Sequence, residues 1–188
     1  MGEVVIDPDG WAEGARRVPS PNFDARPDDV AVSLLVVHAI SLPPRVFSGD
    51  CVERFFLNAL EASEHPYFVG INGVRVSAHF FIRRDGELVQ FVSCRDRAWH
   101  AGVSTWQGRS RCNDFSIGIE LEGSDDDVFE EAQYRCLSGL VECLRHRYPI
   151  AAVAGHADIS PGRKTDPGTH FDWTRLPATL VAERHRMV

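Results

Sequence analysis

The segment SLLVVH, residues 33–38, has four consecutive aliphatic side chains followed by a histidine. A short apolar run without polar interruption is the pattern of a fully buried strand, whereas a half-exposed strand would alternate with polar residues. The segment after it contains Pro43, Pro44 and Gly49, so the strand must give way to a loop. The sequence therefore predicts a buried strand whose last side chain, His38, is titratable.

The rest of the chain alternates between helix and strand patterns. We expect helices at 51–60 and 129–149, strands on both sides of Asp85-Gly86 within 76–93, a strand at 115–123, and a short strand at 151–154. Segments 61–74 and 98–114 are expected to be loops, and loops this long in a compact domain are usually functional. The prediction is one mixed α/β domain, residues 31–188, preceded by an irregular arm, residues 1–30, that packs on its surface.

Charge and composition exclude several classes of protein. The formal net charge is −7, from 20 basic and 27 acidic side chains, so the positive surface that binds nucleic acid is not expected. We find neither an apolar run of about 20 residues nor a leader-like N-terminus, which predicts a cytoplasmic protein that does not enter a membrane. The five cysteines form no CxxC pair and are expected to be free thiols in a reducing compartment.

The segment GHADISPGRKTDPG, residues 155–168, brings His156, Lys164 and Asp166 into one proline-stiffened stretch. Together with His38, it supplies two histidines and a carboxylate, the three protein ligands that a catalytic zinc requires while its fourth position stays open. Spacing alone leaves two interpretations open, because a histidine is more often a hydrogen-bonded structural residue than a metal ligand.

Two further charged residues are candidates for the same site. In FSIGIELEG, residues 115–123, Glu120 shares a face with Ser116 and Gly118, so small neighbours leave room beside it for a substrate. The alternative for Glu120 is a solvated strand face or an arginine partner, and the alternative for Lys164 is an ordinary surface position. The chain lacks the nucleophile elbow GxSxG, a Walker loop, GxGxxG and HExxH.

Five segments together resemble the AmpD-type N-acetylmuramoyl-L-alanine amidases, more narrowly the cytoplasmic 1,6-anhydromuramyl-peptide amidases of cell-wall recycling. They are LLVVHAISLPP, EHPYFVG, RVSAHFFIRRDGELVQFV, RAWHAGVSTWQGRSRCNDFSIGIELEG and GHADISPGRKTDPG. The resemblance extends from about Trp11 to Trp173. It implies a central mixed sheet flanked by helices, as in phage lysozyme-type amidases and peptidoglycan-recognition proteins.

The resemblance also assigns roles to residues at matching positions. It implies one zinc ion per chain held by His38, His156 and Asp166, with Glu120 as general base and Lys164 as the residue that stabilises the oxyanion. Substrate-binding positions are implied for Arg75, Trp99, Arg111 and Asn113. Ala39 departs from the family, which usually has asparagine after the strand-ending histidine.

The activity implied by the resemblance is hydrolysis of the amide between the lactyl group of 1,6-anhydro-N-acetylmuramic acid and L-Ala of stem peptides. The expected setting is peptidoglycan recycling in the bacterial cytoplasm, by a monomer whose partners are anhydromuramyl peptides. Such an activity lowers the muropeptide signal that induces β-lactamase in some bacteria. The alternative is a non-catalytic muropeptide-binding module on the same fold, typical of chains that have lost a zinc ligand.

Overall fold

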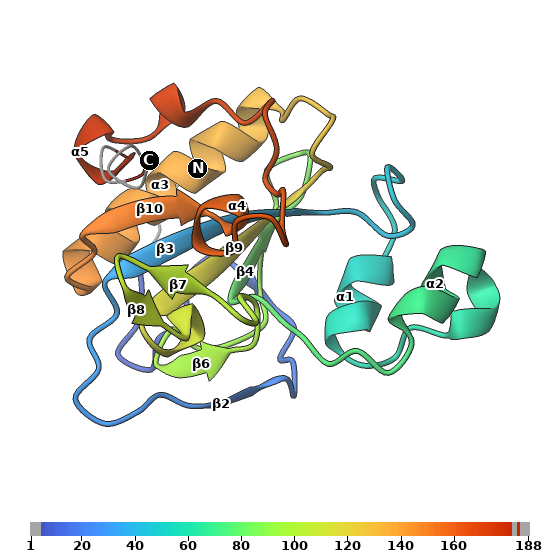
Figure 1. Cartoon of the computed structure of the whole chain (residues 1–188), viewed down its shortest axis with the longest axis horizontal. Coiled ribbons are helices and arrows are strands. Elements are labelled where there is room, and N and C mark those ends of the chain that lie inside the picture. The colour runs from blue at the N-terminus through green and yellow to red at the C-terminus, as the bar shows by residue number, and fades with distance from the viewer. Residues whose placement is uncertain (1–4, 182–183, 185–188) are drawn as a thin grey trace.

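In the computed structural model, which describes residues 5–181 and 184, six strands form one sheet (Figure 1). In spatial order they are β1 (Arg16–Arg17), β5 (Leu88–Gln90), β4 (Phe80–Ile82), β9 (Ser116–Glu122), β3 (Leu34–Ile40) and β10 (Ala152–Gly155). Only β4 and β5 pair antiparallel, while the other neighbours run parallel. The expected mixed sheet is confirmed, and the strand that contains LLVVH lies in it between two parallel partners.

Helices and short ladders surround this sheet. The helices are α1 (Cys51–Phe56), α2 (Pro66–Ile71), α3 (Glu131–Arg147), α4 (His156–Ile159) and α5 (Ala178–Val181), with single 3₁₀ turns at Ala62–Glu64, Cys112–Asp114 and Trp173–Arg175. Outside the main sheet, β2 (Phe23–Ala25) pairs with β6 (Asp96–Ala98), and β7 (Thr105–Trp106) pairs with β8 (Arg109–Ser110). Within the described residues, no helix is long and apolar enough to cross a membrane.

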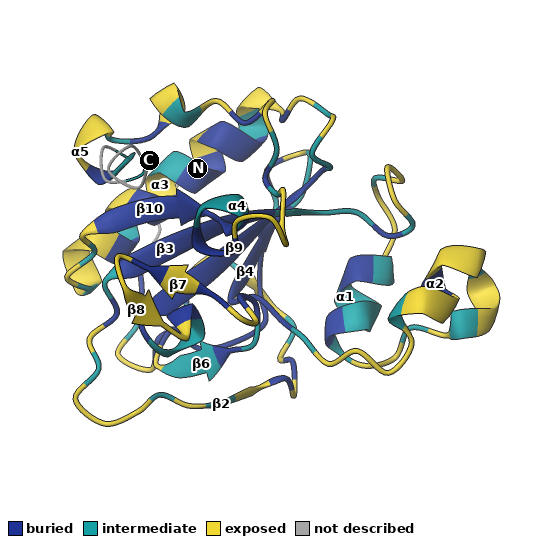
Figure 2. Ribbon diagram, in the orientation of Figure 1, coloured by how far each residue is buried: buried dark blue, intermediate teal, exposed yellow. Residues whose placement is uncertain are grey.

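The two faces of the sheet are covered differently. Long helix α3 packs Leu137, Leu140 and Leu144 onto one face, where Leu35 and Val37 of β3 join the same core. On the other face Leu34 and Val36 pack with the β7–β8 region and α4, and β3 is dark blue in Figure 2 up to its last two residues, which are of intermediate burial. Helices α1 and α2 lie to the right in Figure 1, and their buried side chains Val52, Phe56 and Phe68 share a hydrophobic cluster with Phe81 of β4 and Val89 of β5. Both faces of β3 are therefore buried, as its continuous apolar sequence predicts.

The segment 61–74 is a correction to the expected loop. It contains α2, which begins at Pro66, because proline has the φ angle of a first helical residue and needs no amide hydrogen bond there. His65 caps the helix, since its Nδ1 accepts a hydrogen bond of 3.1 Å from the Tyr67 amide. Helix α1 is shorter than the predicted 51–60 and ends before Asn58, whose φ is +60°.

The N-terminal arm contributes to the sheet instead of only covering it. Strand β1 pairs with β5 at the sheet edge, and the buried side chain of Gln90 ties down the chain before it. Gln90 accepts a hydrogen bond of 2.7 Å from the Ala12 amide and donates one of 2.9 Å to the Gly10 carbonyl. The predicted irregular arm thus includes the short strands β1 and β2. The five cysteines, all of which lie among the described residues, form no disulfide, as expected.

Two glycines, Gly139 within α3 and Gly86 packed against it, allow a matched test of this packing. Gly139 is exposed in the middle of the helix with no heavy atom near its added Cβ, so Gly139→Ala should stabilise the fold by about 0.5–1 kcal/mol. Gly86 has φ of +88°, and a Cβ there would lie 3.0 Å from the Ala132 carbonyl oxygen, so Gly86→Ala should destabilise it. Urea unfolding of both variants measures the two changes, and changes of equal sign would contradict this packing.

Candidate metal centre and its cavity

Strand register places His38 and Glu120 side by side. The parallel pairing of β3 with β9 makes His38 the direct partner of Glu120, and Phe81 of β4 lies on the other side of Glu120. Paired residues of neighbouring strands point to the same face, so the side chains of His38 and Glu120 both project from the sheet face opposite α3. His38 and Glu120 are 1% and 8% exposed, respectively, so neither lies on a solvated face.

The segment after β10 adds the other two candidate ligands. Val37 pairs with Gly155, the last residue of β10, and His156 follows it as the first residue of α4. Asp166 returns to this point, because the Ala157 amide donates a hydrogen bond of 2.9 Å to its carbonyl oxygen. The predicted loop therefore begins with one helical turn that aims His156 at the end of β3.

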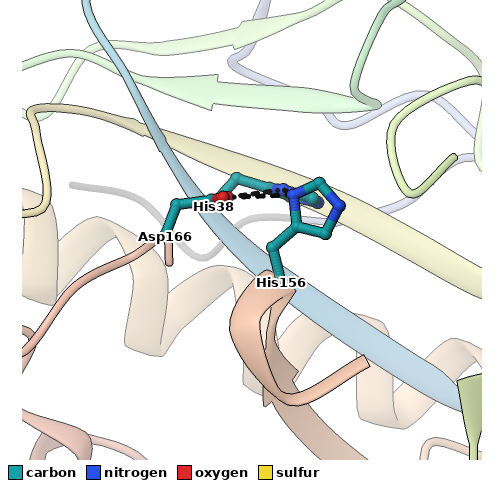
Figure 3. Close-up of side chains that lie close together, drawn as sticks. All are labelled: His38, His156 and Asp166. Carbon is teal, nitrogen blue, oxygen red and sulfur yellow. Dashed lines mark hydrogen bonds and ion pairs between the residues drawn. The ribbon is translucent and has the colours of Figure 1, made fainter. Parts of the chain in front are cut away.

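Figure 3 shows the three side chains pointing toward one another. The Nδ1 atoms of His38 and His156 are 3.0 Å apart, and Asp166 Oδ2 lies 3.0 Å from the first and 3.1 Å from the second. Ligand atoms around a tetrahedral zinc ion with bonds of about 2.0 Å lie roughly 3.3 Å from one another. The triangle is close to that size, and its two imidazoles and carboxylate are ligands that zinc accepts.

The hydrogen bond behind His156 tests whether this donor set fits a metal. Its Nε2 lies 3.2 Å from the Ala101 carbonyl oxygen, which can only accept, so Nε2 carries the proton. In a neutral imidazole Nδ1 then presents a lone pair to the centre of the triangle. Ligating histidines usually have such a backbone or carboxylate partner on the far nitrogen. His38, His156 and Asp166 can therefore hold a metal ion, and their donor set suits zinc.

Burial controls the charges at this site. It lowers the pKa of His38 to about 4, so that imidazole is neutral near neutral pH. Burial also opposes ionisation of Asp166, but hydrogen bonds with His156 and His38 outweigh it and hold the Asp166 pKa below its usual range. Burial raises the pKa of Glu120 well above its usual range, the negative charge of Asp166 adds to this, and Lys164 opposes it.

A cavity of about 650 Å³ opens onto these side chains. His38, Glu120, His156, Lys164 and Asp166 all line it. Its other walls include the apolar side chains Ile40, Leu42, Phe55, Ile71 and Val76, and the polar residues Ser124, Asp125 and Asp126. Glu120 Oε2 is buried and has no hydrogen-bond partner among the described residues. The cavity therefore contains three candidate ligands, one unpaired carboxyl oxygen and the single lysine of the sequence.

The four residues expected to bind substrate do not line this cavity. Arg75 is exposed beside α1 and α2, and Arg111 is exposed and paired with Asp114 at 3.2 Å. The Trp99 side chain lies beside the carboxylate of Asp24 in β2. Asn113 lies behind the site, where its Oδ1 accepts hydrogen bonds from the His100 and Ala101 amides at 3.2 and 2.8 Å. Their contact with substrate stays a prediction.

Sequence reasoning missed His100 as a site residue. This buried side chain lines the cavity, and its Nδ1 lies 2.9 Å from His38 Nε2. It occupies the space that the small side chains of β9 were expected to leave for a substrate, because a Cβ on Gly118 would lie 2.4 Å from His100 Cγ. An unexplained glycine in a buried strand is the signal that could have indicated a close neighbour. Ala39, the departure from the family pattern, lines the cavity.

Comparison with known proteins gives consistent results. The sequence model of the family described as N-acetylmuramoyl-L-alanine amidase matches residues 28–169. A Citrobacter freundii relative, 1,6-anhydro-N-acetylmuramyl-L-alanine amidase AmpD, is 54% identical over 185 residues, which cover 97% of this chain and 98% of the relative.

Two solved structures extend the comparison. A crystal structure of a selenomethionine AmpD derivative is 56% identical, has a TM-score of 0.90, and matches over 94% of this chain and 99% of its own. The Escherichia coli amidase AmiD, solved with anhydro-N-acetylmuramic acid-L-Ala-D-γ-Glu-L-Lys, is 27% identical, with a TM-score of 0.57 over 98% of this chain and 66% of AmiD. With the family model matching most of its length and a near-full-length relative above half identity, this chain belongs to the N-acetylmuramoyl-L-alanine amidase family.

Proposed function

We propose that this chain is a zinc-dependent hydrolase of the amide between the lactyl group of 1,6-anhydro-N-acetylmuramic acid and L-Ala of stem peptides. The observation that carries the proposal is the combination, in one cavity, of the His38–His156–Asp166 triangle with the unpaired carboxyl of Glu120. The name of the Citrobacter relative and the ligand bound to AmiD support the choice of substrate. The proposed setting is cytoplasmic peptidoglycan recycling by a monomer, where cleavage would lower the muropeptide signal for β-lactamase induction.

The three candidate ligands and Glu120 divide the chemistry between them. When bound, zinc would polarise the scissile carbonyl and lower the pKa of a water toward about 7. Glu120 takes a proton from the attacking water and later delivers it to the amine of L-Ala as the carbon–nitrogen bond breaks. Its buried position beside His38, with a raised pKa, suits a carboxyl that must both accept and release a proton.

Lys164 lines the same cavity, within electrostatic reach of Glu120 and His38. Its ammonium group stabilises the negative charge that develops on the carbonyl oxygen in the tetrahedral intermediate. Nineteen of the 20 basic residues are arginine, and Lys164 is the remaining one (20 − 19 = 1). A compact ammonium concentrates its charge at one point, unlike a guanidinium, and so suits a single oxygen.

The reaction can be tested directly on anhydromuramyl tripeptide. We expect mass spectrometry to show free tripeptide and free anhydro sugar, to show neither after chelation, and to show both again after zinc is restored. Asp166→Ala is the control, because loss of a ligand should prevent recovery on adding zinc. Intact substrate after incubation with the zinc-loaded protein would favour the non-catalytic muropeptide-binding module instead.

Glu120→Gln tests the proton-transfer role without changing the size of the side chain. We expect zinc content to stay at one ion per chain and kcat to fall by about 10²–10⁴-fold. Glu122→Gln is a matched control, since it removes a carboxylate from the same face of β9 that is instead bonded to the Ser48 and Arg84 amides. Equal kcat values for the two variants would remove Glu120 from the mechanism.

Lys164→Ala should lower kcat by about 10²–10³-fold with little change in KM, because the charge it meets is fully developed only in the transition state. Lys164→Arg restores the charge but not its compact shape, and we expect partial recovery. Steady-state kinetics on the tripeptide substrate separates the two constants. A rise in KM alone would make Lys164 a substrate-binding residue.

A further inference from the structure

One short segment supports both candidate histidine ligands from behind. The His100 side chain faces His38 Nε2 at 2.9 Å, and the carbonyl oxygen of the next residue, Ala101, accepts from His156 Nε2 at 3.2 Å. The Asn113 side chain holds this segment in place by accepting from both of its amides. The positions of the two imidazoles therefore depend on residues 100–101 as well as on the strands that carry them.

The carbonyl oxygen of Cys112 determines the donor and the acceptor in each hydrogen bond behind His38. Ser116 Oγ lies 2.6 Å from the Cys112 carbonyl oxygen, and this short contact requires the serine hydroxyl to donate. Ser116 Oγ can then only accept from His100 Nε2, 3.2 Å away, so His100 carries its proton on Nε2. The His100 Nδ1 lone pair in turn accepts from His38 Nε2. His38 Nδ1 is left unprotonated, with its lone pair toward Asp166 and His156.

Asp166 competes for the same proton of His38. Its Oδ2 lies 3.0 Å from His38 Nδ1, so a proton on that nitrogen would make a good hydrogen bond but would block metal binding. The acceptor at His100 Nδ1 stabilises the other tautomer at a similar distance of 2.9 Å. The ring of His100 packs directly against Gly118, where any side chain would collide with it. The stronger of these two acceptors determines which nitrogen of His38 carries the proton, and therefore whether Nδ1 is free to bind a metal.

We propose that His100, oriented by Ser116, is a positioning residue that keeps the proton of His38 on Nε2 and so leaves Nδ1 free to bind the metal. This inference rests on the proposed function for the identity of the metal, zinc. It gives His100 no contact with substrate. We call the hydrogen bonds that run from Ser116 through His100 to His38 the relay. Removing this relay should weaken zinc binding by about 10–100-fold, the usual effect of losing a partner behind a ligating histidine.

The tautomers can be measured in the metal-free protein by ¹⁵N NMR of the histidine rings, which distinguishes protonated from unprotonated nitrogens. In the unaltered chain we expect His38, His100 and His156 to carry their protons on Nε2. In His100→Phe, which keeps a ring of similar size but no acceptor, we expect the His38 proton to move to Nδ1 and bond to Asp166. A His38 proton on Nδ1 in the unaltered chain would overturn the proposal.

Zinc affinity, measured by competition with a chromogenic chelator, separates positioning from packing. His100→Asn retains an amide oxygen near the place of Nδ1 but fills less space than His100→Phe. The relay therefore requires tighter zinc binding by the asparagine variant, whereas a purely structural role requires tighter binding by the phenylalanine variant. Tighter zinc binding by His100→Phe than by His100→Asn, with both variants shown to be folded by circular dichroism, would overturn the proposal.

Two serines that hydrogen-bond to the backbone of Cys112, the first residue of the 3₁₀ turn Cys112–Asp114, provide a matched pair. Ser116→Ala removes the acceptor for His100 Nε2, whereas Ser104→Ala removes a buried hydroxyl that accepts from the Cys112 amide and does not contact His100. We expect only Ser116→Ala to shift the His38 tautomer and weaken zinc binding, and equal effects of the two would count against the relay. Neither the His38 tautomer nor the zinc affinity depends on catalysis. If both measurements agree with the relay but the chain does not cleave the tripeptide, only the proposed reaction is refuted.

Discussion

The parallel pairing of β3 with β9 and β10 determines where every chemically active side chain of the site lies. It makes His38 the partner of Glu120 and brings His156 to the same sheet end. Because side chains alternate between the faces of a strand, a shift of one residue would turn His38 into the apolar core under α3 and Leu35 or Val37 out of it. The packing of Leu35 and Val37 against α3 thus fixes the register on which the chemistry depends.

Burial then makes both imidazoles of the triangle depend on specific partners. An imidazole in an apolar interior destabilises the fold unless both nitrogens are satisfied, and the structure supplies a carbonyl behind His156 and a second histidine behind His38. The atoms that remain face one another around the triangle of Nδ1 and Oδ2 atoms. A site built in this way has its ligands oriented before a metal arrives, which reduces the reorganisation needed on binding.

Much of the fold follows from local sequence patterns, but part of the site does not. The strands around His38 and Glu120 and the long helix α3 were predictable because hydrophobic periodicity reports burial directly. Helix α2 was not, since Pro66 and two glycines read as loop signals although proline is also a good first residue of a helix. The triangle of candidate ligands was predictable mainly by resemblance, because the spacing of His38, His156 and Asp166 alone left a structural role open.

The residues around the triangle were harder to place because they lie on irregular segments. Sequence gives no direction for a side chain in a loop, so Trp99, Arg111 and Asn113 could be placed near the site but not toward or away from it. Asn113 is close to the site, yet it stabilises the 100–101 backbone. The room beside Gly118 was inferred correctly and assigned to the wrong occupant, since the His100 ring fills it.

Glu120 is the residue at which stability and the proposed chemistry conflict. A buried carboxyl oxygen without a partner destabilises a fold by roughly 1–3 kcal/mol, a cost that an apolar side chain at this position would not have. A module that only holds a muropeptide gains little from such a group unless the ligand pairs with it permanently. A hydrolase needs a carboxyl that is free to take a proton in one step and give it up in the next. An unsatisfied carboxyl beside three converging ligands therefore favours catalysis over simple binding.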